Sequence, residues 1–474
     1  MRMDDFVGRS RELAMLDDVL DGVKEGIEHR SPGKCLMLRG RRRVGKSALV
    51  EEFTRRSRLP TLFFTAAREV PGGELESFSE AVADSDLPER AQYLEDPPAN
   101  WSAALRLLAD ILPDDTPSLV VLDEVPYLMD RVDAFEGILQ RAWDRQLSRK
   151  PVLLLLIGSD LSMMKALNSY DRPFHQRGTE MVLGPLNPAE IGQMLGLEPA
   201  AAFDAALVTG GLPLICADWR KGAGLWDFLE RSLAKPLSAL VVSARLMLAA
   251  EFPDQAMAEH VLRAIGSGER TFTNIARAAG GISHSTLSRA LDLLVQKGIV
   301  ASNLPVSLRP SKERRYTIDD PYLRFWLALV EPYLDEIERL RGDLVVNRIR
   351  ASWTSWRGRA IEPLVRESLA RTLPSQSIPY ARKIGGYWTR SNDVEIDIVG
   401  ADDAPVAKEL LFVGSIKWLD NDKFDRRDLT ALQNHRAALT DEDLPLVGVS
   451  RSGFDCKGLD GAFGPDDLIK GWQR

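Results

Sequence analysis

Residues 40–47, which read Gly-Arg-Arg-Arg-Val-Gly-Lys-Ser, limit the possible folds of this chain more than any other feature. They fit the phosphate-binding pattern G-x-x-x-x-G-K-[ST] without a mismatch. The apolar run at residues 35–38 predicts a buried strand before this loop, and apolar residues at helical spacing predict a helix after it. Such a loop points backbone N–H groups and a helix N-terminus at phosphate oxygens. We therefore expect an α/β domain that binds a nucleotide here.

Each position of this loop has an expected part in binding. Gly40 and Gly45 let the backbone curl, Lys46 neutralises the β- and γ-phosphates, and Ser47 offers its hydroxyl to Mg²⁺. The alternative is a glycine-rich turn that binds nothing, and the strand and helix predicted on either side make it the weaker hypothesis. The residues expected to contact the nucleotide are Gly40, Arg41, Arg42, Arg43, Val44, Gly45, Lys46, Ser47 and Ala48.

A second apolar run, residues 118–122, ends in Asp123 and Glu124. Continuous apolar strands are typical of parallel sheets that are buried on both faces, and ligands bind at the carboxyl ends of such strands. We expect Asp123 to bind the Mg²⁺ shell and Glu124 to polarise the attacking water. The alternative is that two acids simply end a strand.

Composition limits the class of protein. The 474 residues predict roughly three domains, and 45% hydrophobic with 27% charged residues is ordinary for a soluble globular protein. A net charge of -8 argues against a chain that is basic overall but not against local basic patches. The three cysteines have neither disulfide nor metal spacing, so we expect a reducing, cytoplasmic environment without zinc. Residues 1–5 are polar and no apolar run approaches about 18 residues, so we expect no export signal and no membrane partner.

Residues 254–318 predict a winged helix-turn-helix, because three helical patterns precede two β-like runs at 299–302 and 315–318. The third helix suits a DNA major groove, and the loop between the two runs could reach phosphates of duplex DNA. The alternative is a packing and relay domain that does not bind DNA. The candidate DNA contacts are His284, Ser285, Ser288 and Arg289 on the helix, and Arg309, Lys312 and Arg314 in the loop.

Several motifs together resemble the archaeal-type ATPase family, which is similar to a branch of the AAA-like signal-transduction (STAND) ATPases. They are F-V-G-R-x-x-E-L, G-R-R-R-V-G-K-S, V-V-L-D-E-V-P-Y-L, I-G-S-D-L-S-M-M and G-G-L-P-L-I, and they follow one another in that family's order. The resemblance implies an ATP-binding core of five parallel strands flanked by helices, followed by a small helical lid. No guanine-binding N/T-K-x-D box is present, which favours ATP over GTP.

The same resemblance implies further site residues. Gly8 and Arg9 would fold over the adenine, and Ser159 would sense the γ-phosphate from the tip of a third strand. Arg177 would act as an arginine finger in a neighbouring subunit of a homo-oligomer, and Pro213 in the lid would approach the nucleotide. From the residues alone, Ser10 is the expected N-cap of the helix that follows Arg9.

The C-terminal residues resemble a domain of unknown function that is similar to the PD-(D/E)XK nuclease fold. A helix beginning at Arg357 and β-like runs at 388–399 and 410–418 are expected there. The resemblance assigns the metal-binding and catalytic positions to Glu362, Asp397 and Lys417, with Gln433 in an auxiliary place. Ser415 departs from the pattern because it stands where the second acid belongs, so we expect a degenerate nuclease. The alternative for Lys417 and Asp397 is a structural ion pair.

The predicted fold class is therefore a multidomain α/β P-loop NTPase. The expected domains are an ATPase core at 1–186, a lid at 187–250, a winged helix at 251–330, a connector at 331–350 and a nuclease-like domain at 351–474. We expect an ATPase that uses ATP and Mg²⁺ as a switch controlling DNA binding or assembly with itself or a partner protein. Two alternatives remain open: a DNA-binding regulator whose core binds nucleotide without turnover, and an ATP-controlled nuclease.

Overall fold

The computed structural model describes residues 6–28, 32–67, 72–252 and 256–473. The chain divides into two compact units, Met1–Pro185 and Leu186–Arg474, and each is described by itself. In these described ranges, no helix is long and apolar enough to cross a membrane. The polar segment at residues 1–5 lies outside them.

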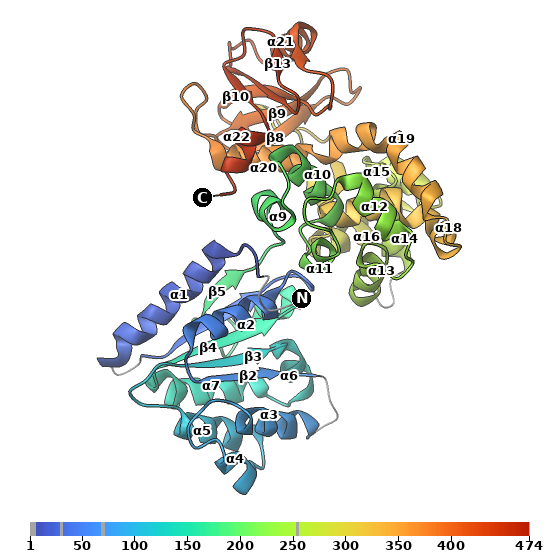
Figure 1. Cartoon of the computed structure of the whole chain (residues 1–474). Coiled ribbons are helices and arrows are strands. Elements are labelled where there is room, and N and C mark those ends of the chain that lie inside the picture. The colour runs from blue at the N-terminus through green and yellow to red at the C-terminus, as the bar shows by residue number, and fades with distance from the viewer. Residues whose placement is uncertain (1–5, 29–31, 68–71, 253–255, 474) are drawn as a thin grey trace. The chain divides into compact units, whose positions relative to one another are not determined.

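The first unit is built on a parallel sheet of five strands in the order β2-β3-β4-β1-β5 (Figure 1), which confirms the predicted architecture. Its central strands β3 and β4 are buried along their whole length, as expected for a sheet covered on both faces. The strands are β1 Lys34–Arg39, β2 Thr61–Thr65, β3 Ser118–Asp123, β4 Val152–Gly158 and β5 Thr179–Val182.

Helices cover both faces of this sheet (Figure 1). An aromatic cluster fills one side, where Phe64 meets Phe78 and Trp101 meets Phe135, each pair edge to face with centroids 5.2 Å apart. On the other side α1 buries Leu13, Leu16 and Leu20 against the sheet. The helices are α1 Ser10–Glu25, α2 Lys46–Ser57, α3 Gly73–Ala83, α4 Gln92–Glu95, α5 Trp101–Ile111, α6 Val125–Arg131, α7 Phe135–Arg145 and α8 Leu161–Leu167, with short 3-10 turns Gly26–Glu28 and Leu147–Arg149.

The start of α1 differs from the prediction. Ser10 is its first helical residue, and the N-cap residue is Arg9, in the left-handed region at φ 60° without a side-chain cap. The predicted Ser10 cap is therefore wrong. Arg9 cannot cap the helix with its side chain as well, because its guanidinium contacts the phosphate loop, as described below.

The second unit begins with helices and continues into a helix–ribbon unit, the name used here for α14, α15, α16 and the antiparallel pair β6–β7. Ser283 caps α16 by accepting the Thr286 N–H at 3.3 Å, as predicted. The elements are α9 Pro188–Leu195, α10 Pro199–Thr209, α11 Pro213–Ala217, α12 Leu225–Leu233, α13 Ala239–Glu251, α14 Ala256–Gly266, α15 Phe272–Ala278, α16 His284–Gln296, β6 Val300–Asn303, β7 Arg315–Ile318, α17 Pro321–Leu329, a 3-10 turn Glu331–Tyr333, α18 Leu334–Glu338, α19 Gly342–Ala360 and α20 Glu362–Thr372.

The C-terminal part carries a mixed sheet of order β14-β12-β10-β9-β8, with α20 and α22 on one side and α21 on the other. Its elements are β8 Lys383–Trp388, β9 Glu395–Ala401, β10 Leu410–Lys417, β11 Phe424–Asp425, α21 Arg426–Leu439, β12 Leu446–Ser450, β13 Phe454–Asp455, β14 Gly461–Phe463 and α22 Pro465–Lys470. Two expectations are wrong here. The run at 388–399 is interrupted by a turn between β8 and β9, and Arg357 lies near the end of α19 instead of starting a helix.

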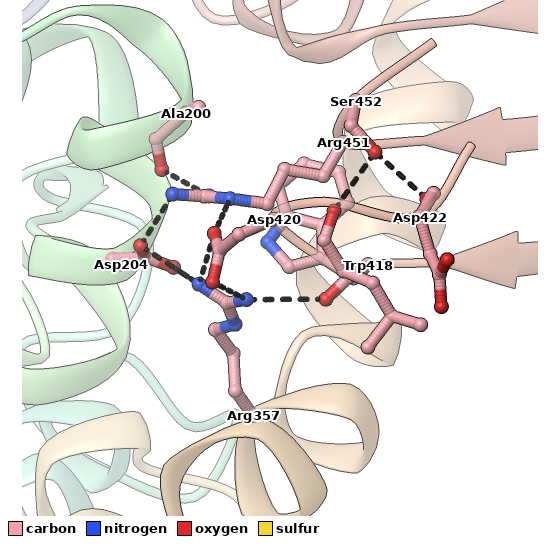
Figure 2. Close-up of polar contacts among 9 residues, drawn as sticks. Ala200, Asp204, Arg357, Trp418, Asp420, Asp422, Arg451 and Ser452 are labelled. Atoms are coloured by element: carbon pink, nitrogen blue, oxygen red, sulfur yellow. Dashed lines mark hydrogen bonds and ion pairs between the residues drawn. The ribbon is translucent and has the colours of Figure 1, made fainter. Parts of the chain in front are cut away.

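A buried ionic cluster ties α10 to the C-terminal sheet (Figure 2). Arg357, which is 1% exposed, lies 3.2 Å from Asp204 and 2.8 Å from Asp420, and Arg451 lies 2.8 Å and 2.6 Å from the same two acids. Beside this cluster, Phe203 and Trp418 pack edge to face at 5.6 Å. The early helices and the C-terminal sheet of the second unit therefore share one core.

Candidate nucleotide-binding site

The phosphate-binding loop connects β1 to α2, and its backbone requires glycine at two points. Gly45 has φ 90°, a conformation that other residues rarely adopt. At Gly40 a Cβ would come within 2.5 Å of the Leu183 carbonyl oxygen, so no side chain fits without a backbone shift. Helix α2 begins at Lys46, which leaves its first N–H groups free of intrahelical partners and next to the loop.

Lys46 is held across this loop. Its Nζ donates to the carbonyl oxygens of Gly40 at 2.8 Å and Arg41 at 3.1 Å. Burial lowers the pKa of Lys46, and the negative charges of Glu124 and Asp123 oppose that shift. The cation therefore lies between two loop carbonyls and two acids, in a position from which it can bind an anion.

The predicted magnesium and catalytic side chains come together at the carboxyl ends of the central strands. The Ser47 hydroxyl donates to the Asp123 carboxylate at 2.6 Å, and the Ser159 hydroxyl donates to the Glu124 carboxylate at 2.9 Å. A hydroxyl and a carboxylate are hard oxygen donors of the kind that Mg²⁺ prefers. The donor set therefore fits the ion, with waters and phosphate oxygens supplying its remaining ligands.

Glu124 has an unusual backbone. It adopts φ 55° in the left-handed region immediately before α6, where a non-glycine residue costs about 1–3 kcal/mol. Such strain concentrates at functional sites. A cavity of about 320 Å³ opens here, within the usual size range for small-molecule sites. It is lined by Arg42, Arg43, Gly45, Lys46, Ser47, Ala48, Glu124 and Ser159.

Two contacts around the loop were not predicted. The Arg9 guanidinium, which is buried, donates to the carbonyl oxygens of Val44 at 3.0 Å and Gly184 at 2.8 Å. Arg42 donates to the Tyr127 hydroxyl at 3.1 Å. The motifs V-G-R and D-E-V-P-Y contain Arg9 and Tyr127, but nothing in their spacing indicates that either contacts the loop. Both residues brace the loop from outside.

The two remaining predicted nucleotide contacts lie away from the loop in the chain. Arg177 binds Asp144 on α7 through two hydrogen bonds of 2.8 Å and 2.9 Å and also donates to two backbone carbonyls. Its pKa is raised by the hydrogen bond to Asp144. Pro213 is the first residue of α11 in the second unit.

The C-terminal acids are engaged within their own sheet. Asp397 accepts the Ser415 hydroxyl at 2.9 Å and the Ile416 N–H at 2.8 Å, and Lys417 pairs with Asp428 at 3.1 Å. The expected ion pair between Lys417 and Asp397 is therefore wrong. The antiparallel register is the reason, because Gly414 lies opposite Ile398 and the next pair sets Ser415, not Lys417, against Asp397.

The other two nuclease-like positions are Glu362 and Gln433. Glu362 pairs with Arg366 at 2.8 Å, and Gln433 lies exposed on α21. Burial raises the pKa values of both Glu362 and Asp397. Across the described part of the chain, no group of three or more His, Cys, Asp or Glu side chains is arranged to hold a metal ion.

The candidate DNA contacts are exposed. His284, Ser285, Ser288 and Arg289 lie in the first turns of α16, and Arg289 donates to the Ser285 carbonyl at 3.4 Å. Arg309, Lys312 and Arg314 lie in the loop between β6 and β7, where Arg314 donates to the Ser302 hydroxyl at 2.7 Å.

Comparisons with known proteins agree with the fold and the loop. Residues 5–157 match a family model described as "AAA ATPase domain", and residues 326–429 match one described as "Archaea bacterial proteins of unknown function". An uncharacterized protein of Methanocaldococcus jannaschii is 25% identical over 422 residues, covering 88% of each chain. Among solved structures, the Walker-type ATPase PABY2304 of Pyrococcus abyssi aligns with a TM-score of 0.50 and 17% identity, over 68% of this chain and 96% of that one. The ORC2 protein of Aeropyrum pernix aligns with a TM-score of 0.44 and 14% identity, over 73% and 96%.

The five-stranded parallel sheet, the complete phosphate loop and the matched model define the class of the first unit. The protein carries an ATPase domain of the AAA-like P-loop class. This domain is followed by a region similar to archaeal and bacterial proteins of unknown function.

Proposed function

We propose that the protein is a molecular switch that binds and hydrolyses ATP and uses its nucleotide state to control DNA binding by the second unit. One observation supports this proposal above the others. Ser47 contacts Asp123 beside the Ser159–Glu124 pair, so a metal-binding pair and a candidate base lie together at the phosphate loop. This is the set of parts that phosphoryl transfer requires, since its catalysis depends on positioning and electrostatics.

Each residue would contribute one part of the hydrolysis. Lys46 would exchange its two loop carbonyls for phosphate oxygens. Ser47 and Asp123 would hold Mg²⁺, which, when bound, neutralises charge between the β- and γ-phosphates. Glu124 would orient the attacking water and polarise its O–H bond, while the Ser159 hydroxyl holds the carboxylate in place.

Nucleotide state would reach the second unit through helices that follow the ATPase domain, which act as the lid. A switch requires contacts that differ between two states, and Ser159 is the proposed sensor of the γ-phosphate. Because α10 shares a core with the C-terminal sheet, movement of the lid would carry that sheet with it. Arg177 is the proposed finger for a neighbouring subunit, which would require it to leave Asp144 on assembly.

The helix–ribbon unit is the proposed DNA-binding part. The exposed face of α16 would enter the major groove, and Arg309, Lys312 and Arg314 would contact phosphates. We infer that the C-terminal sheet does not cut DNA, since the described residues hold no set of metal-binding acids and Ser415 occupies the place of the second acid.

The test measures ATP turnover and the binding of labelled duplex DNA in wild type and three variants, with ATP, ADP or no nucleotide. Glu124→Gln should bind ATP without turnover and show a stable, ATP-dependent change in DNA affinity. Lys46→Ala should show no nucleotide dependence, and Lys24→Ala, an exposed lysine on α1, serves as the control that behaves as wild type. If Glu124→Gln hydrolyses ATP at the wild-type rate, the proposed base is wrong. If DNA affinity is the same in every nucleotide state, the switch is wrong.

A further inference from the structure

A cavity of about 1000 Å³ lies within the second unit, between the ribbon β6–β7, the end of α19, α20, the edge strand β8 and its neighbour β9. We propose that this cavity binds a phosphate ester that carries a planar ring, in other words a nucleotide-like ligand, at a site separate from the phosphate loop. The proposal rests on the walls of the cavity, the charges that line it and one aromatic side chain, and it does not depend on ATP hydrolysis.

The walls are fixed by backbone hydrogen bonds between the ribbon loop, which is the segment 304–314 between β6 and β7, and the C-terminal part. The Val306 N–H donates to the Gly386 carbonyl at 2.9 Å, and the Ser307 N–H donates to the Pro405 carbonyl at 3.1 Å. In the opposite direction, the Ala407 N–H donates to the Ser307 carbonyl at 3.0 Å. The ribbon loop therefore acts as part of the C-terminal wall, and the cavity is preformed, which reduces the entropy lost when a ligand binds.

A side-chain contact closes the same wall. The Trp388 indole N–H donates to the Glu313 carbonyl at 2.8 Å, and Arg315 lies over the Trp388 ring, 4.5 Å from its centroid. Arg315 also pairs with Glu395 at 2.5 Å. These contacts occupy the Trp388 ring and fix one end of the cavity.

The lining carries a surplus of positive charge, with eight cationic against five acidic side chains. The three acids of the C-terminal wall already have partners: Glu362 pairs with Arg366, Glu395 pairs with Arg315, and Asp397 accepts from Ser415 and Ile416. Asp319 and Glu367 are exposed. The acids therefore leave little capacity to bind a cation.

Four of the cations have no such partner. Within the described ranges, the side chains of Arg270, Arg359, Arg382 and Lys383 make no hydrogen bond or ion pair. Arg270 is half-buried, and burial followed by the nearby charge of Arg315 lowers its pKa, while the carboxylates of Glu362 and Glu395 oppose that shift. Burying an unpaired cation costs free energy. An anionic group in the cavity would offset that cost, and phosphate matches the guanidinium geometry.

An aromatic wall accompanies these cations. Trp356 lines the cavity and is half-buried. Its ring is held in place by Trp353, stacked at 5.4 Å, and by Phe325, edge to face at 5.6 Å. A rigid indole beside unpaired guanidinium groups is suited to a nucleobase, since stacking of this kind contributes about 1–3 kcal/mol per base.

The size of the cavity restricts the ligand. Its volume lies at the upper end of the roughly 300–1,000 Å³ range of small-molecule sites. This suits a nucleotide or dinucleotide. The same chemistry could come from a free dinucleotide or from the end of a single strand, and the experiment distinguishes the two.

The experiment uses the full chain in the Lys46→Ala background, so that the phosphate loop does not contribute. Two fluorescent probes are titrated, a dinucleotide with one phosphodiester and a short single-stranded oligonucleotide. Arg270→Ala/Arg359→Ala should weaken binding by about tenfold or more, because two charge-assisted contacts are lost. Arg390→Ala is the matched control, since Arg390 is exposed in the turn between β8 and β9 and does not line the cavity. It should bind as the parent does.

The outcomes distinguish the two possible ligands, a free dinucleotide and the end of a single strand. Binding of the dinucleotide identifies a free small ligand, and binding of the oligonucleotide alone identifies the end of a strand. Absence of binding for both probes, or equal binding by the double variant and its parent, overturns the proposal. Arg382→Gln/Lys383→Gln, at two exposed positions, repeats the test if the first variant loses its thermal transition. ATP turnover by the otherwise wild-type chain should be unaffected by both pairs of substitutions, so failure here is distinct from failure of the proposed switch.

Discussion

Two acidic positions in this protein occupy similar places in the sequence and differ in what surrounds them. Asp123 and Asp397 each belong to a strand and were each predicted to bind a metal ion. In the ATPase domain, Asp123 accepts the hydroxyl of Ser47 from the phosphate loop and the N–H of Glu124, the next residue in the chain. In the C-terminal sheet, Asp397 accepts hydrogen bonds from the Ser415 hydroxyl and from a backbone N–H of the neighbouring strand.

The difference follows from strand direction. Parallel strands bring their carboxyl ends to one edge of a sheet, so Asp123 and Ser159, from β3 and the end of β4, both face the phosphate loop. The antiparallel register of β9 and β10 sets Asp397 beside Ser415, where a hydroxyl takes the place of a second carboxylate. Asp123 and Asp397 each accept one hydroxyl and one backbone N–H, so what separates them is the partner. Ser47 comes from the phosphate loop, whereas Ser415 belongs to the adjacent strand of the same sheet.

Changing one acid in each region, Glu124 beside Asp123 and Asp397 itself, tests whether only the ATPase domain carries out chemistry. Glu124→Gln should lower ATP turnover by about 10²–10⁴-fold, because it removes the proposed base. Asp397→Asn should leave turnover at the wild-type rate. Steady-state ATPase assays at saturating ATP measure both. Equal losses in the two variants would show that the C-terminal acid contributes to hydrolysis.

Arg357→Ala tests the view that buried charge in the second unit is structural. Removing Arg357 leaves Asp204 buried with one partner fewer, and breaking a buried pair in this way costs about 3–5 kcal/mol. Denaturant unfolding of the full chain measures the loss. Arg350→Ala removes an exposed pair with Glu230 and a contact with the Trp226 ring, and should cost only about 1–2 kcal/mol. A similar small loss for Arg357 would contradict the assignment.

The two serines that contact these acids, Ser159 and Ser415, should differ in what their removal does. Ser159→Ala should reduce turnover by about tenfold, because a hydrogen bond that positions Glu124 is worth roughly 1 kcal/mol or slightly more. Ser415→Ala should leave turnover unchanged and lower stability by about 1 kcal/mol. Turnover and thermal unfolding are measured on both variants. Loss of ATP binding in Ser159→Ala would assign that serine to the nucleotide, not to Glu124.

The smallest effect is expected for DNA cleavage. Wild type should not nick supercoiled or linear DNA in Mg²⁺ or Mn²⁺, because a single carboxylate holds either ion weakly. Ser415→Glu restores a second acid, and any cutting it gains should disappear when Lys417→Ala is added. Gel assays over a range of metal concentrations measure this. Robust cutting by wild type that is lost in Asp397→Ala would overturn the degenerate assignment.

The sequence by itself determined the ATPase domain, because the information there is local. A contiguous loop motif and continuous apolar runs predict the strand–loop–helix order, and the resemblance carried by those local motifs implies the five parallel strands that the structure has. Asp123 and Glu124 could be predicted as site residues for the same reason, since they stand at the carboxyl end of a buried strand. The ribbon at β6–β7 and the cap at Ser283 were also local signals.

Only the tertiary structure decided the contacts between residues far apart in the chain. Arg9 reaches the carbonyl of Val44, and Asp204 meets Arg357 and Arg451, although no spacing connects these positions. Lys417 pairs with Asp428 and not with Asp397, because of the strand register and the position of α21. Register, packing and the direction of each strand are properties of the whole fold. The sequence offers each charged side chain many residues of opposite charge, and only burial and geometry decide which of them forms the ion pair.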